Sequence, residues 1–232
     1  MNKLRIILSL LGLLAVAAGG YAASVYIPHG DRKRLGKRYI ACIGDSITFG
    51  HGVARTRKRD AWTYVLERKL GDAWQVLNYG FSGTTAQDGG DLPYRRVGFL
   101  DDALESGAEI IILMLGTNDS KPYNWNKEGY EAAMKGLAAQ IRRCCPDARL
   151  VLAVPPRAFP GEDGTVAFDI QNDIIRDCIM PFITDLAPKM SAGLVDLYGF
   201  TESHPEYFGD GVHPNVLGNS AIAGFLLERL GL

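Results

Sequence analysis

Cysteine is scarce in this sequence, and its spacing favours neither a disulfide framework nor a metal site. The four residues, Cys42, Cys144, Cys145 and Cys178, include no pair at the spacing typical of zinc ligands. Cys42 falls in an apolar run and Cys144 on the apolar side of a predicted helix. We therefore expect buried free thiols.

An excess of charge of either sign is also missing, with 25 basic and 26 acidic residues. A nucleic-acid partner would require a basic face, which the composition does not favour. We therefore predict no nucleic-acid partner and look for function in a local site instead.

A long apolar run occurs at the N-terminus. Lys3 and Arg5 precede an uncharged stretch, Ile6–Pro28, that is rich in Leu, Ala and Gly. It is long enough to cross a membrane and also resembles a signal peptide. We predict that residues 1–28 are a signal peptide or membrane anchor and that residues 29–38 are a basic linker. The protein is then expected to be exported, either secreted or membrane-anchored with the rest of the chain outside the cytoplasm, although the basic linker is not what a simple positive-inside rule predicts for an exported domain.

Short apolar runs alternate with amphipathic stretches over residues 39–232, which predicts one α/β domain with a parallel sheet and helices on both faces. The run Ile110–Leu115 does not alternate, as expected of a strand that is covered on both sides. The predicted strands are Tyr39–Ile43, Gln75–Asn78, Glu109–Leu115, Arg149–Val154 and Leu194–Leu197. Predicted helices contain Trp62 to Leu70, Tyr130 to Cys144, a segment from Ile170 that Pro181 should kink or end, and a last one after Pro214.

Small-residue turns with polar side chains follow the strands and precede the last helix. They are Gly44–Thr48, Asn78–Thr84, Gly116–Asp119 and Asp210–Pro214. Ligands of open parallel sheets bind beyond the carboxyl ends of the strands, so we expect these turns to meet at one site.

The residue types in these turns suit acyl transfer. The Ser46 hydroxyl needs a base to take its proton, and an imidazole such as that of His213 titrates in the right range. Asp210, three residues earlier, is placed to orient that imidazole. The backbone N–H groups of Ser46 and Gly83 and the side-chain amide of Asn118 are candidate donors to an oxyanion. This chemistry requires no cofactor or metal, and we predict neither.

These turns resemble the conserved blocks of the SGNH/GDSL hydrolase family, in order and at plausible separations. Ser46, Gly83, Asn118 and His213 match the four letters of the name, and Asp210 matches the usual acid of the triad. The resemblance spans about Tyr39 to the C-terminus. It implies a three-layer, flavodoxin-like sandwich with a five-stranded parallel sheet, and a serine esterase that acts through an acyl-enzyme.

Structural explanations exist for each residue taken alone. Ser46 could cap the following helix. Asn118 could be a turn residue, and Asn118-Asp119-Ser120 is also a glycosylation acceptor sequence. His213 could be an ordinary loop residue. The combination favours catalysis because no single structural role accounts for all of these turns.

Competing motifs are incomplete. Gly50–Arg55 begins like a dinucleotide-binding fingerprint but has Arg at its third glycine position. Gly80–Thr84 lacks the second glycine of a nucleophile elbow, which makes Ser82 a poor alternative nucleophile. A metal cluster fits no standard zinc spacing, its candidate members being His204, Glu206, Asp210 and His213.

Substrate contacts are expected from the segments after the third and fourth strands, Lys121–Trp125 and Pro155–Pro160, which combine aromatic and polar side chains. The predicted contacts are Asp45, Tyr123, Trp125 and Phe159. The run Gly116–Pro122 resembles family members that deacetylate carbohydrates, so we predict a carbohydrate O-acetylesterase acting on a small-molecule or carbohydrate ester. A lysophospholipase or thioesterase and a catalytically idle binding module are the alternatives.

Overall fold

The computed structural model describes residues 31–232, which are built around a five-stranded, all-parallel sheet in the order β2-β1-β3-β4-β5. Its strands are β1 (Arg38–Gly44), β2 (Trp74–Gly80), β3 (Ile110–Met114), β4 (Arg149–Val154) and β5 (Gly193–Asp196). This order is that of flavodoxin-like folds. The predicted α/β fold is confirmed, and every predicted strand lies within two residues of its observed bounds.

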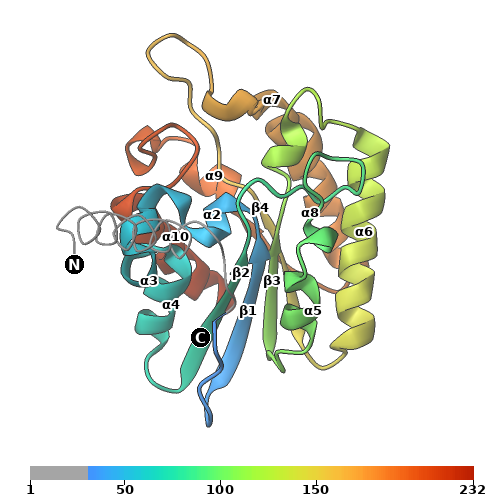
Figure 1. The fold of residues 1–232 in the computed structure, drawn as a ribbon, viewed down its shortest axis with the longest axis vertical. Coiled ribbons are helices and arrows are strands. Elements are labelled where there is room, and N and C mark those ends of the chain that lie inside the picture. The colour runs from blue at the N-terminus through green and yellow to red at the C-terminus, as the bar shows by residue number, and fades with distance from the viewer. Residues whose placement is uncertain (1–30) are drawn as a thin grey trace, which may run out of the picture.

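Helices cover both faces of the sheet (Figure 1). One layer contains α5 (Phe99–Leu104), α6 (Lys127–Cys144) and α8 (Met180–Lys189), and the other contains α4 (Trp62–Leu70) and α10 (Val216–Leu230). The shorter helices are α2 (Ser46–Phe49), α3 (Arg57–Asp60), α7 (Asn172–Ile174) and α9 (Leu197–Thr201). The molecule is therefore a three-layer sandwich.

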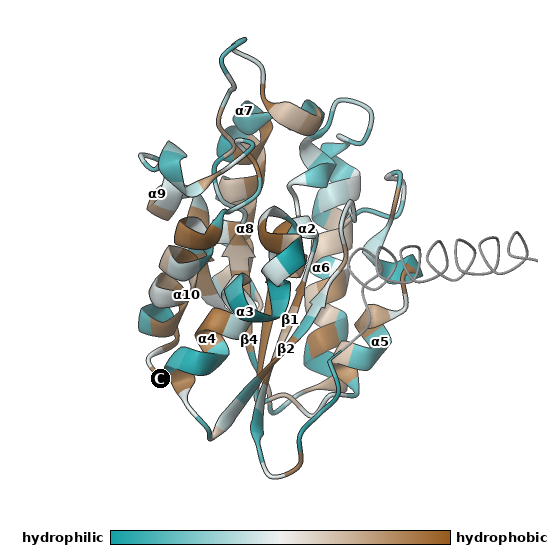
Figure 2. Cartoon of the chain, turned by 60° about the vertical axis from the view of Figure 1, so that its left-hand side comes forward, coloured by the Kyte–Doolittle hydropathy of each residue, from teal (hydrophilic) through white to brown (hydrophobic). Residues whose placement is uncertain are grey.

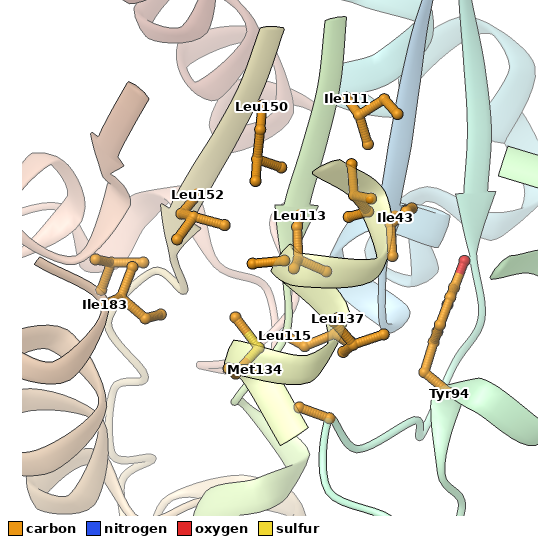
Figure 3. Close-up of a cluster of buried hydrophobic side chains, with 14 of the residues drawn as sticks. Ile43, Tyr94, Ile111, Leu113, Leu115, Met134, Leu137, Leu150, Leu152 and Ile183 are labelled. Carbon is orange, nitrogen blue, oxygen red and sulfur yellow. The ribbon is translucent and has the colours of Figure 1, made fainter. Parts of the chain in front are cut away.

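Two apolar cores follow from the alternation of side chains along each strand. Toward α6 and α8, buried residues of the sheet pack against Met134, Leu137 and Ile183 (Figure 3). On the other face, Ile40 and Ile112 belong to a cluster with the buried residues of α4 and α10. Apolar colour accordingly runs along the central strands and alternates with hydrophilic colour around the outer helices (Figure 2).

The helix after residue 170 is predicted to kink or end at Pro181. Pro181 does not end it: α7 continues through a π-helical turn, Ile175–Ile179, directly into α8, so the regular helix is interrupted but not terminated. A proline removes one backbone donor and its ring crowds the preceding turn. The wider π-helical turn lies just before the proline and interrupts the regular α-helical hydrogen bonding at that point.

The prediction of buried thiols is wrong for three of the cysteines. Cys42 is buried, but Cys144 is exposed and Cys145 and Cys178 are half-buried. Cys144 is the last residue of α6, and the buried stripe of that helix ends one turn earlier at Ile141.

Of the predicted basic linker, the structure describes residues 31–38. Arg38 belongs to β1, and the segment before it contacts the edge strand β2. The backbone N–H of Arg34 donates to Gln75 Oε1, and Gln75 Nε2 donates to the carbonyl of Arg32. The predicted signal peptide or anchor lies outside the described residues. Within residues 31–232, no helix is both long and apolar enough to cross a membrane.

Candidate active site

The turn after β1 leads into α2, which lies close to the carboxyl end of the strand (Figure 1), and Ser46 is the first residue of this helix. Asp45, rather than Ser46, caps this helix, since Asp45 Oδ1 accepts the backbone N–H of Ile47 at 2.9 Å. The close approach of β2 to α2 requires Gly80, because a Cβ there would lie 2.2 Å from the backbone nitrogen of Phe49. The Ser46 hydroxyl is thereby left available for other partners.

The hydrogen-bond partner of the Ser46 hydroxyl is His213, which comes from the loop before α10. His213 Nε2 lies 2.9 Å from Ser46 Oγ, and His213 Nδ1 lies 2.7 Å from Asp210 Oδ2. Asp210 Oδ1 also accepts the backbone N–H groups of Val212 and His213. The three side chains form one hydrogen-bonded line from carboxylate to imidazole to hydroxyl.

The electrostatics of this line keep Asp210 ionised. Partial burial raises the pKa of the Asp210 carboxyl, but the hydrogen bonds from the ring and backbone of His213 outweigh burial and lower that pKa. An ionised Asp210 accepts the Nδ1 proton of a neutral imidazole, which leaves Nε2 with a lone pair directed at the hydroxyl.

The turns after β2 and β3 bring Gly83 and Asn118 to the same side. Gly83 adopts a φ of +85°, a conformation that glycine reaches readily because it has no Cβ. Asn118 Nδ2 donates to the carbonyl of Thr84 at 3.1 Å. An amide nitrogen carries two hydrogens, so one N–H orients Asn118 and the other remains for a ligand.

Asp119, the neighbour of Asn118, holds the loop that follows Gly83 in place. Its carboxylate accepts the backbone N–H groups of Ala86 and Gln87 at 2.9–3.0 Å. The side chain is fully buried. Burial raises the pKa of Asp119 to about 7, although the two N–H donors act in the opposite direction.

A small pocket of about 150 Å³ opens above these groups. The rings of His51 and Phe168 lie 4.5 Å and 5.1 Å from the ring of His213. Burial and the neighbouring His213 lower the pKa of His51. The pocket is lined by Ser46, His51, Ser82, Gly83, Thr117, Asn118, Lys121, Phe168, Ile170, Val212 and His213.

None of the four predicted substrate contacts lines this pocket. Asp45 is buried beneath Ser46 as a helix cap, and burial raises its pKa to about 6. Phe159 is buried against Phe208, with the rings 5.4 Å apart. Trp125 packs on Tyr130 in the core, and Tyr123 is 62% exposed outside the pocket.

Sequence reasoning missed several pocket residues, foremost His51, Lys121 and Phe168. Lys121 begins the segment Lys121–Trp125, from which substrate contacts are predicted, and His51 follows the Ser46 turn. Because both residues come after strands of the sheet, the sequence could have indicated them. Phe168 lies in an irregular segment without periodicity and carried no such signal.

The side chains considered as a metal cluster, His204, Glu206, Asp210 and His213, do not form one. Among residues 31–232, no group of three or more His, Cys, Asp or Glu side chains is arranged to hold a metal ion. His204 pairs instead with Glu206, with Nδ1 2.8 Å from Oε1.

Comparison with known proteins gives the same picture. The sequence profile of the GDSL-like Lipase/Acylhydrolase family matches residues 42–221. An acetylxylan esterase of Xylanibacter ruminicola is 28% identical over 91% of this chain and 46% of its own length. The cellulase/esterase CelE of Acetivibrio thermocellus is 26% identical over 61% of this chain and 20% of its own length. The chain thus spans less than half the length of either relative.

Solved structures share the fold. The carbohydrate acetylesterase Est24 of Sinorhizobium meliloti superposes with a TM-score of 0.67 at 22% identity, covering 84% of this chain and 99% of the other. The aryl esterase of M. smegmatis superposes with a TM-score of 0.65 at 21% identity, covering 84% and 98%. Because the family match at residues 42–221 covers more than half of its length, the chain belongs to the GDSL-like lipase/acylhydrolase family.

Proposed function

We propose that this protein removes O-acetyl groups from carbohydrates through a Ser46–His213–Asp210 triad and an acyl-enzyme. The observation that carries the proposal is the 2.9 Å separation of His213 Nε2 and Ser46 Oγ, with the Asp210 carboxylate 2.7 Å behind the ring. A general base within hydrogen-bond reach is the first requirement for activating a serine.

In the first step, Ser46 Oγ attacks the ester carbonyl while its proton passes to His213 Nε2. Asp210 stabilises the imidazolium that forms. The carbonyl oxygen becomes an oxyanion, for which the N–H groups of Ser46, Gly83 and Asn118 are the candidate donors. Each such donor is worth roughly 10²–10³ in rate.

In the second step, the tetrahedral intermediate collapses and the C–O bond to the alcohol breaks. His213 gives its proton to the departing alcohol oxygen, and Ser46 keeps the acyl group. Water then attacks the acyl-enzyme with His213 again as base, which releases the acid and restores the serine proton.

The size of the pocket supports a short acyl group. A volume of about 150 Å³ is comparable to a cavity that holds one benzene molecule. It suits an acetyl group, whereas the methylenes of a long acyl chain would stay in water and add no binding energy. The acetylxylan esterase and the carbohydrate acetylesterase among the similar proteins support the same substrate class.

A series of 4-nitrophenyl esters tests the acyl preference. We expect kcat/KM to fall at least about tenfold from acetate to octanoate, because the pocket stabilises only the first carbons of the chain. Released 4-nitrophenol is the readout, and O-acetylated xylan with release of acetate is the parallel substrate. A preference for octanoate, with no acetate released from xylan, would instead assign the protein to the lysophospholipase or thioesterase class.

We further propose that the protein is exported, because Ile6–Pro28 carries no charge and follows Lys3 and Arg5. The expected result in a bacterial host is esterase activity outside the cytoplasm for the full chain, and retention in the cytoplasm when residues 1–28 are deleted. Cell fractionation with a cytoplasmic marker enzyme measures both. Full-length protein that stays with the marker would contradict export.

A further inference from the structure

Phe168 is an aromatic side chain that the chemistry of the triad leaves unused. The residue is 51% exposed, which is unusual for a phenylalanine, yet it lines the pocket, and its ring lies 5.1 Å from the His213 ring at an interplanar angle of 71°. An exposed aromatic side chain loses the free energy that burial would supply. Its position in the pocket therefore calls for a ligand that covers it.

The backbone at this position is strained. Phe168 and Asp169 have φ values of 62° and 59°, in the left-handed region that glycine and asparagine favour. Strained non-glycine residues persist where the surrounding structure determines them, and they cluster at ligand-binding sites. A relaxed backbone at Phe168 would send the ring in another direction.

Both ends of the segment are tied to turns that carry catalytic groups. The backbone N–H of Phe159 donates to the carbonyl of Gly211 at 2.8 Å, beside Asp210. The backbone N–H of Gln171 donates to Ser120 Oγ at 3.1 Å, beside the Asn118 turn. These two hydrogen bonds hold the segment between β4 and α7 at the carboxyl ends of the strands (Figure 1).

The side of the pocket on which Phe168 lies identifies the part of the substrate it meets. His213 must protonate the departing alcohol oxygen, so the alcohol half of the ester lies on the His213 side of the carbonyl. The donors to the oxyanion come from Gly83 and Asn118, on other turns. Because Phe168 contacts the imidazole itself, its exposed ring faces the alcohol half and not the acyl group.

We propose that Phe168 is a specificity-determining residue that stacks against the ring of the substrate's alcohol half. This inference rests on the proposed hydrolysis at Ser46 and deepens it. The C–H groups on the face of a pyranose carry a partial positive charge, and the face of an aromatic ring is electronegative. A saturated ring in the alcohol therefore gains both apolar burial and electrostatic attraction, whereas a short linear alcohol gains little of either.

The test compares esters that share the acetyl group and differ in the alcohol. The substrates are methyl 2-O-acetyl-xylopyranoside, cyclohexyl acetate and ethyl acetate. The main variant is Phe168→Asn, because asparagine tolerates the left-handed backbone and replaces the aromatic ring by a small carboxamide. Phe168→Tyr is the conservative variant. Leu35→Asn is the matched control, since Leu35 is 95% exposed and precedes β1 at the opposite end of the sheet.

We expect Phe168→Asn to lower kcat/KM about tenfold for the two ring esters, mainly through KM, and at most about threefold for ethyl acetate. Phe168→Tyr and Leu35→Asn should keep the wild-type ratio between ring and linear esters. An equal loss on all three esters would overturn the inference, because it would mean that Phe168 acts only by positioning His213. Wild-type kcat/KM of Phe168→Asn on all three esters would overturn it as well.

Failure of the proposed function has a different signature. Turnover that persists in Ser46→Ala, or hydrolysis of cyclohexyl acetate without any hydrolysis of the acetylated xyloside, counts against the triad or against the carbohydrate substrate. If only the acetylated xyloside is not hydrolysed, the ring preference can still be measured on cyclohexyl acetate. The comparison of wild type with Phe168→Asn on that ester then still tests whether Phe168 binds the ring of the alcohol.

Discussion

Replacing Ser46 by alanine is expected to lower kcat for 4-nitrophenyl acetate by at least about 10⁴-fold. In the proposed mechanism the hydroxyl is the atom that forms the acyl-enzyme, and loss of the nucleophile in a serine hydrolase leaves only the contribution of oxyanion donors and binding. The fold should persist, because Asp45 and not Ser46 caps α2. Initial rates on the purified variant measure the first effect, and thermal unfolding, with a Tm within a few degrees of wild type, measures the second.

Ser82→Ala is the matched control for this experiment. Ser82 also lines the pocket and stands in a near-match to a nucleophile elbow, but His213 Nε2 bonds to Ser46. We expect its kcat to stay within about tenfold of wild type. Labelling by an organophosphonate should accordingly modify Ser46 in wild type and in Ser82→Ala. Full turnover in Ser46→Ala, or a label on Ser82, would refute the assignment of the nucleophile.

The meeting of Ser46, His213 and Asp210 could be predicted because parallel topology dictates it. Each residue stands in a short polar turn, and an all-parallel sheet of this strand order brings such turns to one edge. The alternation of apolar runs gave the strands within two residues for the same reason, since buried parallel strands are uniformly apolar.

The residues that line the pocket could not all be predicted in the same way. Phe159 and Phe168 lie in one irregular segment, and which ring reaches the pocket depends on the positive φ of Phe168. Local sequence favours no such conformation at a phenylalanine, because glycine and asparagine are the residues that signal it. The choice is made by anchors to Gly211 and Ser120, which are distant in sequence.

Asp119 shows the same limit for a residue inside a recognised motif. Its place next to Asn118 was visible, but its role depends on the backbone N–H groups of Ala86 and Gln87, more than thirty residues earlier. Those bonds hold the loop that follows Gly83 against the Asn118 turn. Removing a partner from buried donors costs about 1–3 kcal/mol for each group left unsatisfied. Asp119 therefore links the stability of the fold to the geometry of the candidate oxyanion donors, Gly83 and Asn118.

This link predicts a pH-dependent stability that Asp119→Asn should abolish. Burial raises the pKa of Asp119 to about 7 in the folded protein, whereas the unfolded chain titrates near 4. Between these values the folded state holds a proton that the unfolded state has lost, so this group's contribution to stability is full below about pH 4 and is lost as the pH rises through 7. From pH 5 to pH 8 the loss amounts to at most about 3 kcal/mol.

Urea unfolding of wild type and Asp119→Asn at pH 5, 6, 7 and 8 measures this contribution as a difference. The free energy of unfolding of wild type relative to the variant should fall as the pH rises, most steeply between pH 5 and 7. Asp45, whose pKa burial raises to about 6, is present in both proteins, so its own titration largely cancels. Parallel curves for the two proteins would mean that Asp119 does not change its charge over this range. In that case its carboxylate is held ionised by the Ala86 and Gln87 donors, and its role is confined to fixing the loop that follows Gly83.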